Sequence, residues 1–369
     1  MKVVHLISHF DLGGAERIAA SIAKSHSSGY EYHIVEMMRG HSSFTTSFIS
    51  ELRTARVHCH RSFMPDIRFH FLFERIAAMI FPLTFLPLFL RLKPDVIHAH
   101  TEGPDMCVVA FFKTFPWLRK RCRIVRTIHN TCLWTGQRRI GNAVETFYQR
   151  YATNIAISKG VAMKYMEVYG GAEPTIIYNG VEEVGQNPYE GVRKDRINVI
   201  FSGRFERQKG IHTLIKTIKE QPKDSPYHFH IFGAGSLREE IETSLGSQEN
   251  VSINPPLFGL SAYLSSFDYM IMPSEFEGLS IVAMEAAMAG LPNIISDIAG
   301  LRETLPAEWP LKVPGSKTSF LQILMEEIPH SSVEECKKYS KRLGVLARAY
   351  ARHHFSVEKM QQDYELVYS

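Results

Sequence analysis

The feature that most constrains the fold is an alternation, along the whole chain, of short apolar runs with amphipathic stretches. The runs are rich in β-branched and aromatic residues, as buried strands are, while the stretches between them have helical periodicity. Strands that alternate with helices predict βαβ units and a parallel sheet. The first-half runs are Val3–Ser8, Tyr32–Met37, Val96–His100, Ile124–His129, Asn154–Ser158 and Thr175–Tyr178.

A second series of strand-like runs follows, so the sequence predicts an α/β protein with two open parallel sheets. Its members are Asn198–Ser202, Tyr227–Phe232, Val251–Asn254, Asp268–Met272 and Asn293–Ile295. Between the two series, Glu182–Arg196 contains turn formers but no apolar period, which is typical of a linker. A length of 369 residues is also enough for two domains. We therefore expect one domain over residues 1–185 and another over 186–352.

Composition excludes several classes of protein. With 45% hydrophobic and 22% charged residues, the chain resembles neither a disordered nor a fibrous protein. Its 5 cysteines include no C-x-x-C pair, which argues against a disulfide framework and a zinc site. The first residues are too quickly interrupted by polar side chains for a secretory signal. We expect a cytoplasmic protein without a nucleic-acid partner.

Positive charge and apolar residues both accumulate in the first half of the chain. Residues 1–185 contain 22 Lys and Arg against 15 Asp and Glu, with much of the excess in the basic run between Lys113 and Arg126. The segment Phe69–Leu92 is strongly apolar, but Pro82 and Pro87 should break a membrane-spanning helix. Two interpretations stay open, namely buried helices over the first sheet or a surface that contacts an anionic membrane.

Three loops at strand ends contain residues suited to an anionic ligand. Asp11–Arg17, with Gly13 and Gly14, follows the first strand and opens a helix, where backbone amides favour negative charge. Phe201–Gly210 places Arg204 and Lys209 at a strand end, where cations can neutralise a diphosphate. Pro273–Ala286 combines two carboxylates with a helix start, an order that suits a sugar nucleotide.

Together these motifs resemble the family-4 retaining glycosyltransferases, which have the two-domain GT-B fold with Rossmann-like domains facing across a cleft. The family pattern G-R-x-x-x-x-K-G, then G-x-G, then E-x7-E is matched in order. The matching residues are Gly203-Arg204 with Lys209-Gly210, Gly233-Ala234-Gly235, and Glu277 with Glu285. Gly13–Arg17 and Tyr178–Val181 are similar to family motifs as well.

The resemblance implies a nucleotide-sugar donor in the second domain and an acceptor at the first. Arg204 and Lys209 would hold the diphosphate, Glu285 the ribose and Glu277 the transferred sugar. The remaining donor-binding residues would contribute backbone amides or close approach, namely Gly13, Gly14, Gly203, Gly233, Gly278, Leu279, Ser280 and Ile281. The family also returns its last helix to the first domain, so we assign residues 353–369 there.

His129 ends a strand of the first domain and matches the histidine with which the family contacts the donor sugar. His98 and His100 have a similar placement, but we interpret them as structural. Pro255-Pro256 stands where the family reads the nucleobase through its backbone, and proline has no N–H. We expect a uridine diphosphate sugar, although the choice between uracil and guanine stays open.

The resulting hypothesis is a retaining, metal-independent glycosyltransferase of surface polysaccharide synthesis, such as lipopolysaccharide or capsule. It would transfer a hexose or N-acetylhexosamine to a glycan or lipid-linked glycan, without a cofactor, on the inner face of the cell membrane. Arg204, Lys209, Glu277 and His129 would form its active site. Two alternatives remain: a nucleotide-sugar epimerase, and a non-catalytic sugar-binding protein of the same fold.

Overall fold

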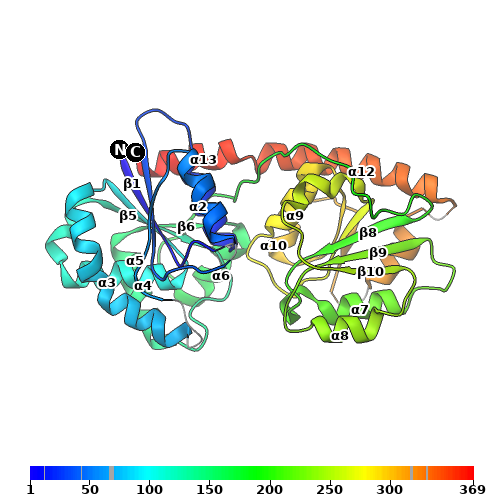
Figure 1. Cartoon of the computed structure of the whole chain (residues 1–369), viewed down its shortest axis with the longest axis horizontal. Coiled ribbons are helices and arrows are strands. Elements are labelled where there is room, and N and C mark those ends of the chain that lie inside the picture. The colour runs from blue at the N-terminus through cyan, green and yellow to red at the C-terminus, as the bar shows by residue number, and fades with distance from the viewer. Residues whose placement is uncertain (12, 43, 66–69, 316–318, 330) are drawn as a thin grey trace. The chain divides into compact units, whose positions relative to one another are not determined.

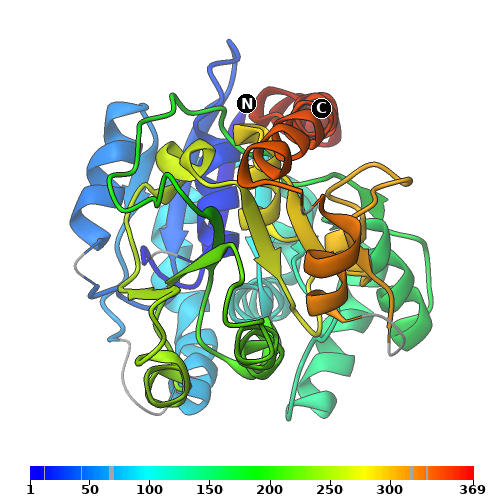
Figure 2. The same ribbon diagram turned by 90° about the vertical axis from the view of Figure 1, so that its right-hand side faces the viewer.

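A computed structural model describes residues 1–11, 13–42, 44–65, 70–315, 319–329 and 331–369. Leu12 and Phe69 of the segments above therefore lie outside the described residues. The contacts divide the chain into two units, residues 1–180 with 357–369 and residues 181–356. Figures 1 and 2 show an open parallel sheet with helices in each unit. The predicted class, α/β with two parallel sheets, is confirmed.

The first unit is built on a sheet whose described strands follow the order β3-β2-β1-β4-β5-β6-β7, all parallel. Its elements are β1 (Lys2–Ile7), α1 (Gly14–Ala23), β2 (Glu31–Glu36), α2 (Thr45–Thr54), β3 (His58–His60), α3 (His70–Leu92), β4 (Val96–His100), α4 (Glu102–Thr114), η1 (Pro116–Arg121), β5 (Arg123–Ile128), α5 (Arg138–Tyr151), β6 (Thr153–Ala156), α6 (Lys159–Tyr169), β7 (Thr175–Ile176) and α13 (Val357–Tyr368). The strand β3 was not predicted.

The second unit repeats this plan with the described order β10-β9-β8-β11-β12-β13, again parallel. Its elements are β8 (Ile197–Ser202), η2 (Arg207–Lys209), α7 (Ile211–Lys219), β9 (Tyr227–Phe232), α8 (Arg238–Leu245), β10 (Val251–Asn254), η3 (Leu260–Ser266), β11 (Tyr269–Met272), α9 (Ile281–Ala289), β12 (Asn293–Ser296), α10 (Ala299–Arg302), β13 (Lys312–Val313), α11 (Phe320–Gln322), η4 (Ile323–Glu327) and α12 (Val333–His354). In both sheets the strand order reverses direction beside the first strand, β1 or β8. Ligands of such sheets bind at the carboxyl ends of the strands near this point.

The helix α3 is continuous through Pro82 and Pro87, so the expectation that these residues break it was wrong. Each proline costs a helix about 3 kcal/mol. Aromatic burial offsets this cost, because Phe81, Phe85 and Phe89 are buried and the Phe85 ring lies 5.1 Å from that of Phe111 in α4. Burying a phenylalanine contributes roughly 1.5–3 kcal/mol.

Both interpretations of the apolar segment have some support, because α3 has one buried and one exposed apolar face. Leu72, Met79, Leu83 and Leu90 are exposed, Met79 by 78% and Leu83 by 69%. Within the described residues, Leu72–Leu92 is long and apolar enough to cross a membrane, a property that it shares with core helices of soluble proteins.

Arg126 is not part of a basic surface, although it lies in the basic run of the sequence. It is 1% exposed, and its Nη1 and Nη2 each lie 2.7 Å from an oxygen of Glu145. Asp105 lies 2.8 Å from Arg126 Nε, and its burial raises its pKa to about 7. A buried guanidinium needs such partners, whereas the exposed Arg121 of the same run does not.

The loops at the carboxyl edge of the second sheet approach one another more closely than side chains would allow. A Cβ on Gly233 would lie 2.0 Å from the carbonyl oxygen of Gly203. Gly210 has a φ of +69°, and a Cβ there would lie 1.9 Å from the carbonyl oxygen of Pro273. The glycines thus let the loops after β8, β9 and β11 pack backbone to backbone.

Substituting Gly210 tests this close packing. We expect Gly210→Ala to lower the free energy of unfolding by at least 1 kcal/mol more than Gly259→Ala does, measured by urea denaturation. Gly259 has a similar φ of +72° but open space around its Cβ position, so it reports the left-handed strain alone, about 1–2 kcal/mol. Equal losses of unfolding free energy in the two variants would contradict the close approach of Gly210 to Pro273.

Substituting Arg126 tests the buried ion group. Arg126→Met should lower the free energy of unfolding by about 3–5 kcal/mol, because it leaves the Glu145 carboxylate buried without its counter-ion. Arg121→Met, in the same basic run but exposed, should change it by less than about 0.5 kcal/mol. A loss below 1 kcal/mol for Arg126→Met would show that the guanidinium is not needed.

Candidate donor site

The predicted donor-binding residues of the second unit gather on the loops after β8 and β11. Glu275 N donates to Gln208 O at 2.9 Å, and Gln208 Nε2 donates to Phe276 O at 3.2 Å. These bonds hold the loop that contains Arg204 and Lys209 beside the loop that contains Glu277. Sequence reasoning did not single out Gln208, because a contact between residues 68 positions apart leaves no local pattern.

Lys209 and Glu277 form an ion pair at the centre of this site. Lys209 Nζ lies 2.5 Å from Glu277 Oε1, and Ser274 Oγ donates to the same oxygen at 3.0 Å. The side chains are only 15% and 9% exposed, so water screens the pair weakly. The structure therefore brings together two residues that the sequence assigned to one donor molecule, and it adds Ser274.

Arg204 is the more accessible cation of the site. Its side chain is exposed, and its Nη2 donates to Gln208 Oε1 at 3.3 Å, a longer bond than that of Lys209. This contact holds the guanidinium near the loops while leaving its other N–H groups to a ligand. A planar guanidinium can bind two oxygens of a diphosphate at once, whereas an ammonium acts as a point charge.

The start of α9 offers a second feature suited to an anion. Ser280 is the N-cap residue, but its side chain makes no capping hydrogen bond. Its hydroxyl is buried and has no partner among the described residues. Helix N-termini favour negative charge through their unpaired N–H groups and their dipole. A buried hydroxyl without a partner at such a terminus therefore points to a ligand that supplies one.

The neighbouring predicted residues lie on the same loop and helix. Gly278 and Leu279 are buried between Glu277 and Ser280, and Ile281 is the first residue of α9. Ser280 N donates to Gly300 O at 3.3 Å, and a Cβ on Gly300 would lie 2.3 Å from Glu277 O. Gly300 of α10, which sequence reasoning missed, thus packs against the Glu277–Ser280 loop and holds it in place. Glu285 lies half-buried in the second turn of α9.

The predicted residues of the first unit lie at the carboxyl ends of β1 and β5. Gly13 is the N-cap of α1 without a side-chain cap, and a Cβ there would lie 2.0 Å from Glu16 Oε2. Glu16 is buried, which raises the pKa of its carboxyl. Gly14 is the first residue of α1 and is exposed. His129 follows β5, is half-buried, and contacts His100.

Comparison with family models identifies both halves of the chain. Residues 12–183 match the model described as Glycosyltransferase Family 4, and residues 196–324 match Glycosyl transferases group 1. Together these matches span most of the chain.

Two curated proteins are similar to this chain. An uncharacterized 41.2 kDa protein in the cps region of Klebsiella pneumoniae is 28% identical over 63% of this chain and 70% of that protein. The capsular polysaccharide biosynthesis glycosyltransferase CapH of Staphylococcus aureus is 23% identical over 78% of each. Four further relatives are matched over only 54–61% of their own length.

A solved structure supports the fold. Anabaena HepE, crystallised with UDP and glucose, has a TM-score of 0.75 and 18% identity, over 100% of this chain and 99% of that one. At this identity the likeness concerns the fold alone. Together with the family models, it shows that this chain belongs to the family-4, group 1 glycosyltransferases and has the GT-B fold.

Proposed function

We propose that this glycosyltransferase transfers a hexose or N-acetylhexosamine from a UDP-sugar to a glycan or lipid-linked glycan, with retention and without a metal ion. The observation that carries the proposal is the Lys209–Glu277 pair, which joins the loop after β8 to the loop that leads into the uncapped start of α9. The names of similar proteins also support this proposal. CapH belongs to capsule synthesis, WclY of Escherichia coli to O-antigen synthesis, and HepE binds UDP and UDP-glucose.

The two cations and the amides would stabilise the leaving group. When the glycosyl bond breaks, negative charge grows on the diphosphate, and preorganised donors stabilise it most where water is scarce. Lys209 Nζ has three protons, so it can keep its bond to Glu277 while another proton meets a phosphate oxygen. Arg204 would bind from the exposed side, and Ser280 would donate its free hydroxyl. These side chains and amides would meet the charge without a metal ion or a cofactor.

Glu277 is better suited to hold the sugar than to attack it. Its Oε1 already accepts from an ammonium and a hydroxyl, and such charge-assisted bonds reduce the nucleophilicity of a carboxylate. The other oxygen can accept a sugar hydroxyl. Transfer with retention would then follow from attack by the acceptor on the face that the diphosphate leaves.

The other predicted residues would complete the donor site. Glu285 would bind the ribose hydroxyls, while Gly203 and Gly233 would keep the backbone open to the diphosphate. Backbone groups of Gly278, Leu279 and Ile281 would bind phosphate oxygens. Gly13, Gly14 and His129 of the first unit would contact the donor and its sugar. The comparisons favour transfer over the epimerase and the non-catalytic alternative.

The exposed face of α3 would bind an anionic membrane, where a lipid-linked acceptor would be located. Leu72, Met79, Leu83 and Leu90 recur at helical spacing, and Arg75 and Arg91 are exposed on the same helix. Apolar side chains that enter the acyl boundary beside cations that meet lipid phosphates are typical of peripheral binding. On this basis we propose that the protein binds a membrane peripherally, and the inner face of the cell membrane is its proposed location.

Removing either cation tests the diphosphate assignment. Arg204→Ala and Lys209→Ala should each lower kcat/KM for the donor by about 10²–10³, because one charged donor to the leaving group is lost. Arg207→Ala is the matched control, since this arginine lies in the same turn but is 81% exposed and pairs with Glu275. Unchanged kcat/KM in folded Arg204→Ala and Lys209→Ala variants would overturn the assignment. NMR of the product anomer tests retention directly.

Flotation with liposomes tests the membrane surface. The protein should float with vesicles that contain anionic lipid at low salt, and less so at high salt. Met79→Ser with Leu83→Ser should reduce flotation, because the serines remove apolar surface that would be buried in the membrane. Val345→Ser with Leu346→Ser, an exposed apolar pair of the second unit, is the control and should float as the original chain does. Absence from the lipid fraction at both salt concentrations would contradict the proposal.

A further inference from the structure

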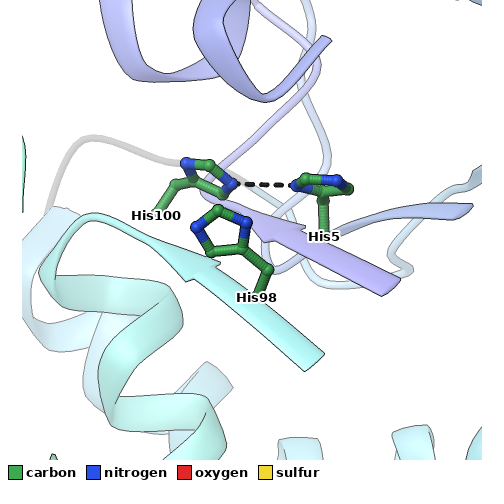
Figure 3. A group of neighbouring side chains, drawn as sticks. All are labelled: His5, His98 and His100. Atoms are coloured by element: carbon green, nitrogen blue, oxygen red, sulfur yellow. Dashed lines mark hydrogen bonds between the residues drawn. The ribbon is translucent and has the colours of Figure 1, made fainter. Parts of the chain in front are cut away.

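A line of hydrogen-bonded histidines runs from the strand end at His129 into the interior of the first unit. His129 Nε2 lies 3.2 Å from His100 Nδ1, and His100 Nε2 lies 3.0 Å from His5 Nδ1. Figure 3 shows the inner bond, with His100 and His5 on neighbouring strands, β4 and β1, and His98 beside them. His5 and His100 come from β1 and β4, and His129 directly follows β5, the next strand of the sheet.

The rings of this line are uncharged at neutral pH. Burial lowers the pKa of His5 and of His129 to about 3, and it lowers the pKa of His100 well below its usual value. A neutral imidazole has one N–H and one bare nitrogen, so each ring donates through one nitrogen and accepts through the other. The groups that face the line, His98, Tyr32 and Tyr368, add no charge to it at neutral pH.

Two hydrogen bonds in series therefore couple the tautomers of all three rings. If His129 donates from Nε2, then His100 must donate from Nε2 to His5, and His5 must have its proton on Nε2. If instead His5 donates from Nδ1, then His100 donates from Nδ1, and His129 has its proton on Nδ1. The state of the innermost ring thus fixes which nitrogen of His129 has a proton.

The inner end of the line selects between these two states. His5 Nε2 is buried and has no partner among the described residues. A buried N–H without an acceptor is rarer in proteins than an acceptor without a donor. The state in which His5 Nε2 is bare is therefore favoured, and in that state His129 presents its Nδ1–H. The part of the chain described here offers no hydrogen-bond partner to that Nδ1.

The neighbouring His98 is a member of the cluster but not of the line. His5, His98 and His100 have ligand atoms within 4.8 Å of one another, the spacing of a metal site. However, His98 Nδ1 bonds to the Tyr368 hydroxyl and His98 Nε2 to Thr127 Oγ1, both at 2.7 Å. Both nitrogens of His98 and of His100 are thus already hydrogen-bonded, which favours a hydrogen-bonded network over a metal centre.

We propose that His100 and His5 are positioning residues that hold His129 as its Nδ1–H tautomer, so that the ring offers a fixed N–H donor to an oxygen of the transferred sugar. The role toward the sugar rests on the proposed function, whereas the tautomer does not. In this arrangement His129 serves as a neutral hydrogen-bond donor, because its Nε2 is occupied by His100. Neither positioning residue touches the substrate.

Nitrogen NMR of the histidine rings tests the tautomer without any substrate. In the intact protein, His129, identified by the signal lost in His129→Asn, should have a protonated Nδ1 and a bare Nε2 at pH 7. His100→Leu should abolish this preference, whereas His100→Asn should keep it, because its amide can donate from near the Nδ1 position. His98→Asn, a control on the same strand with the same burial, should leave it unchanged. A proton on Nε2 of His129 in the intact protein would overturn the proposal, as would an unchanged tautomer in His100→Leu.

Kinetics then test the consequence for transfer. His100→Leu should lower kcat by about 10–100-fold, as loss of an outer partner that orients an imidazole does, with less than a threefold change in KM for the donor. His100→Asn should recover most of the loss, and His98→Asn should retain kcat within about threefold. Equal losses in His100→Leu, His100→Asn and His98→Asn would indicate packing damage and would overturn the positioning role. If the intact protein transfers no sugar, the proposed function fails, and the spectra still decide the tautomer.

Discussion

The donor site depends on backbone contacts that only glycine permits. Gly233 lies against Gly203, and Gly210 lies against Pro273, each at a separation that leaves no room for a Cβ. Because of these contacts, the loops after β8, β9 and β11 form one surface. The Lys209–Glu277 pair follows from this packing, since its members are 68 residues apart and come from different loops. Without the glycines, the charges would have no fixed geometry with respect to the start of α9.

The charged and polar groups of the site keep hydrogen-bonding capacity that a ligand could use. Lys209 neutralises Glu277, but both retain hydrogen-bonding capacity, and Arg204 is held only by a long bond to an amide. Ser280 leaves its hydroxyl unused at a helix start. Burial of an unsatisfied hydroxyl costs about 1–3 kcal/mol. A phosphate oxygen at this position would recover that energy, so the cost of the unsatisfied hydroxyl would contribute to binding in the proposed function.

The sequence predicts the class of the fold, because buried strands leave local patterns, and the motifs single out Lys209 and Glu277, which the structure brings together. Strands such as Val96–His100 and Tyr227–Phe232 have the predicted bounds, since buried parallel strands are continuous apolar runs. The short β3 and β13 lack such runs and were missed. The continuity of α3 through two prolines and the burial of Arg126 depend on tertiary partners, namely α4 and Glu145, which no local pattern reveals. The same holds for Gln208, Ser274 and Gly300, whose contacts connect distant loops.

The two units provide different chemistry from the same architecture. In the second unit, the ends of β8 and β11 lead to charged groups, which suits a diphosphate whose charge grows during the reaction. In the first unit, His129 after β5, His100 at the end of β4 and His5 inside β1 are kept neutral by burial. A neutral donor can bind a sugar hydroxyl without competing for the diphosphate, whereas a cation there would attract it. Burial thus keeps the histidine line uncharged, and in the proposed function the direction of its hydrogen bonds would decide which nitrogen of His129 donates to the sugar.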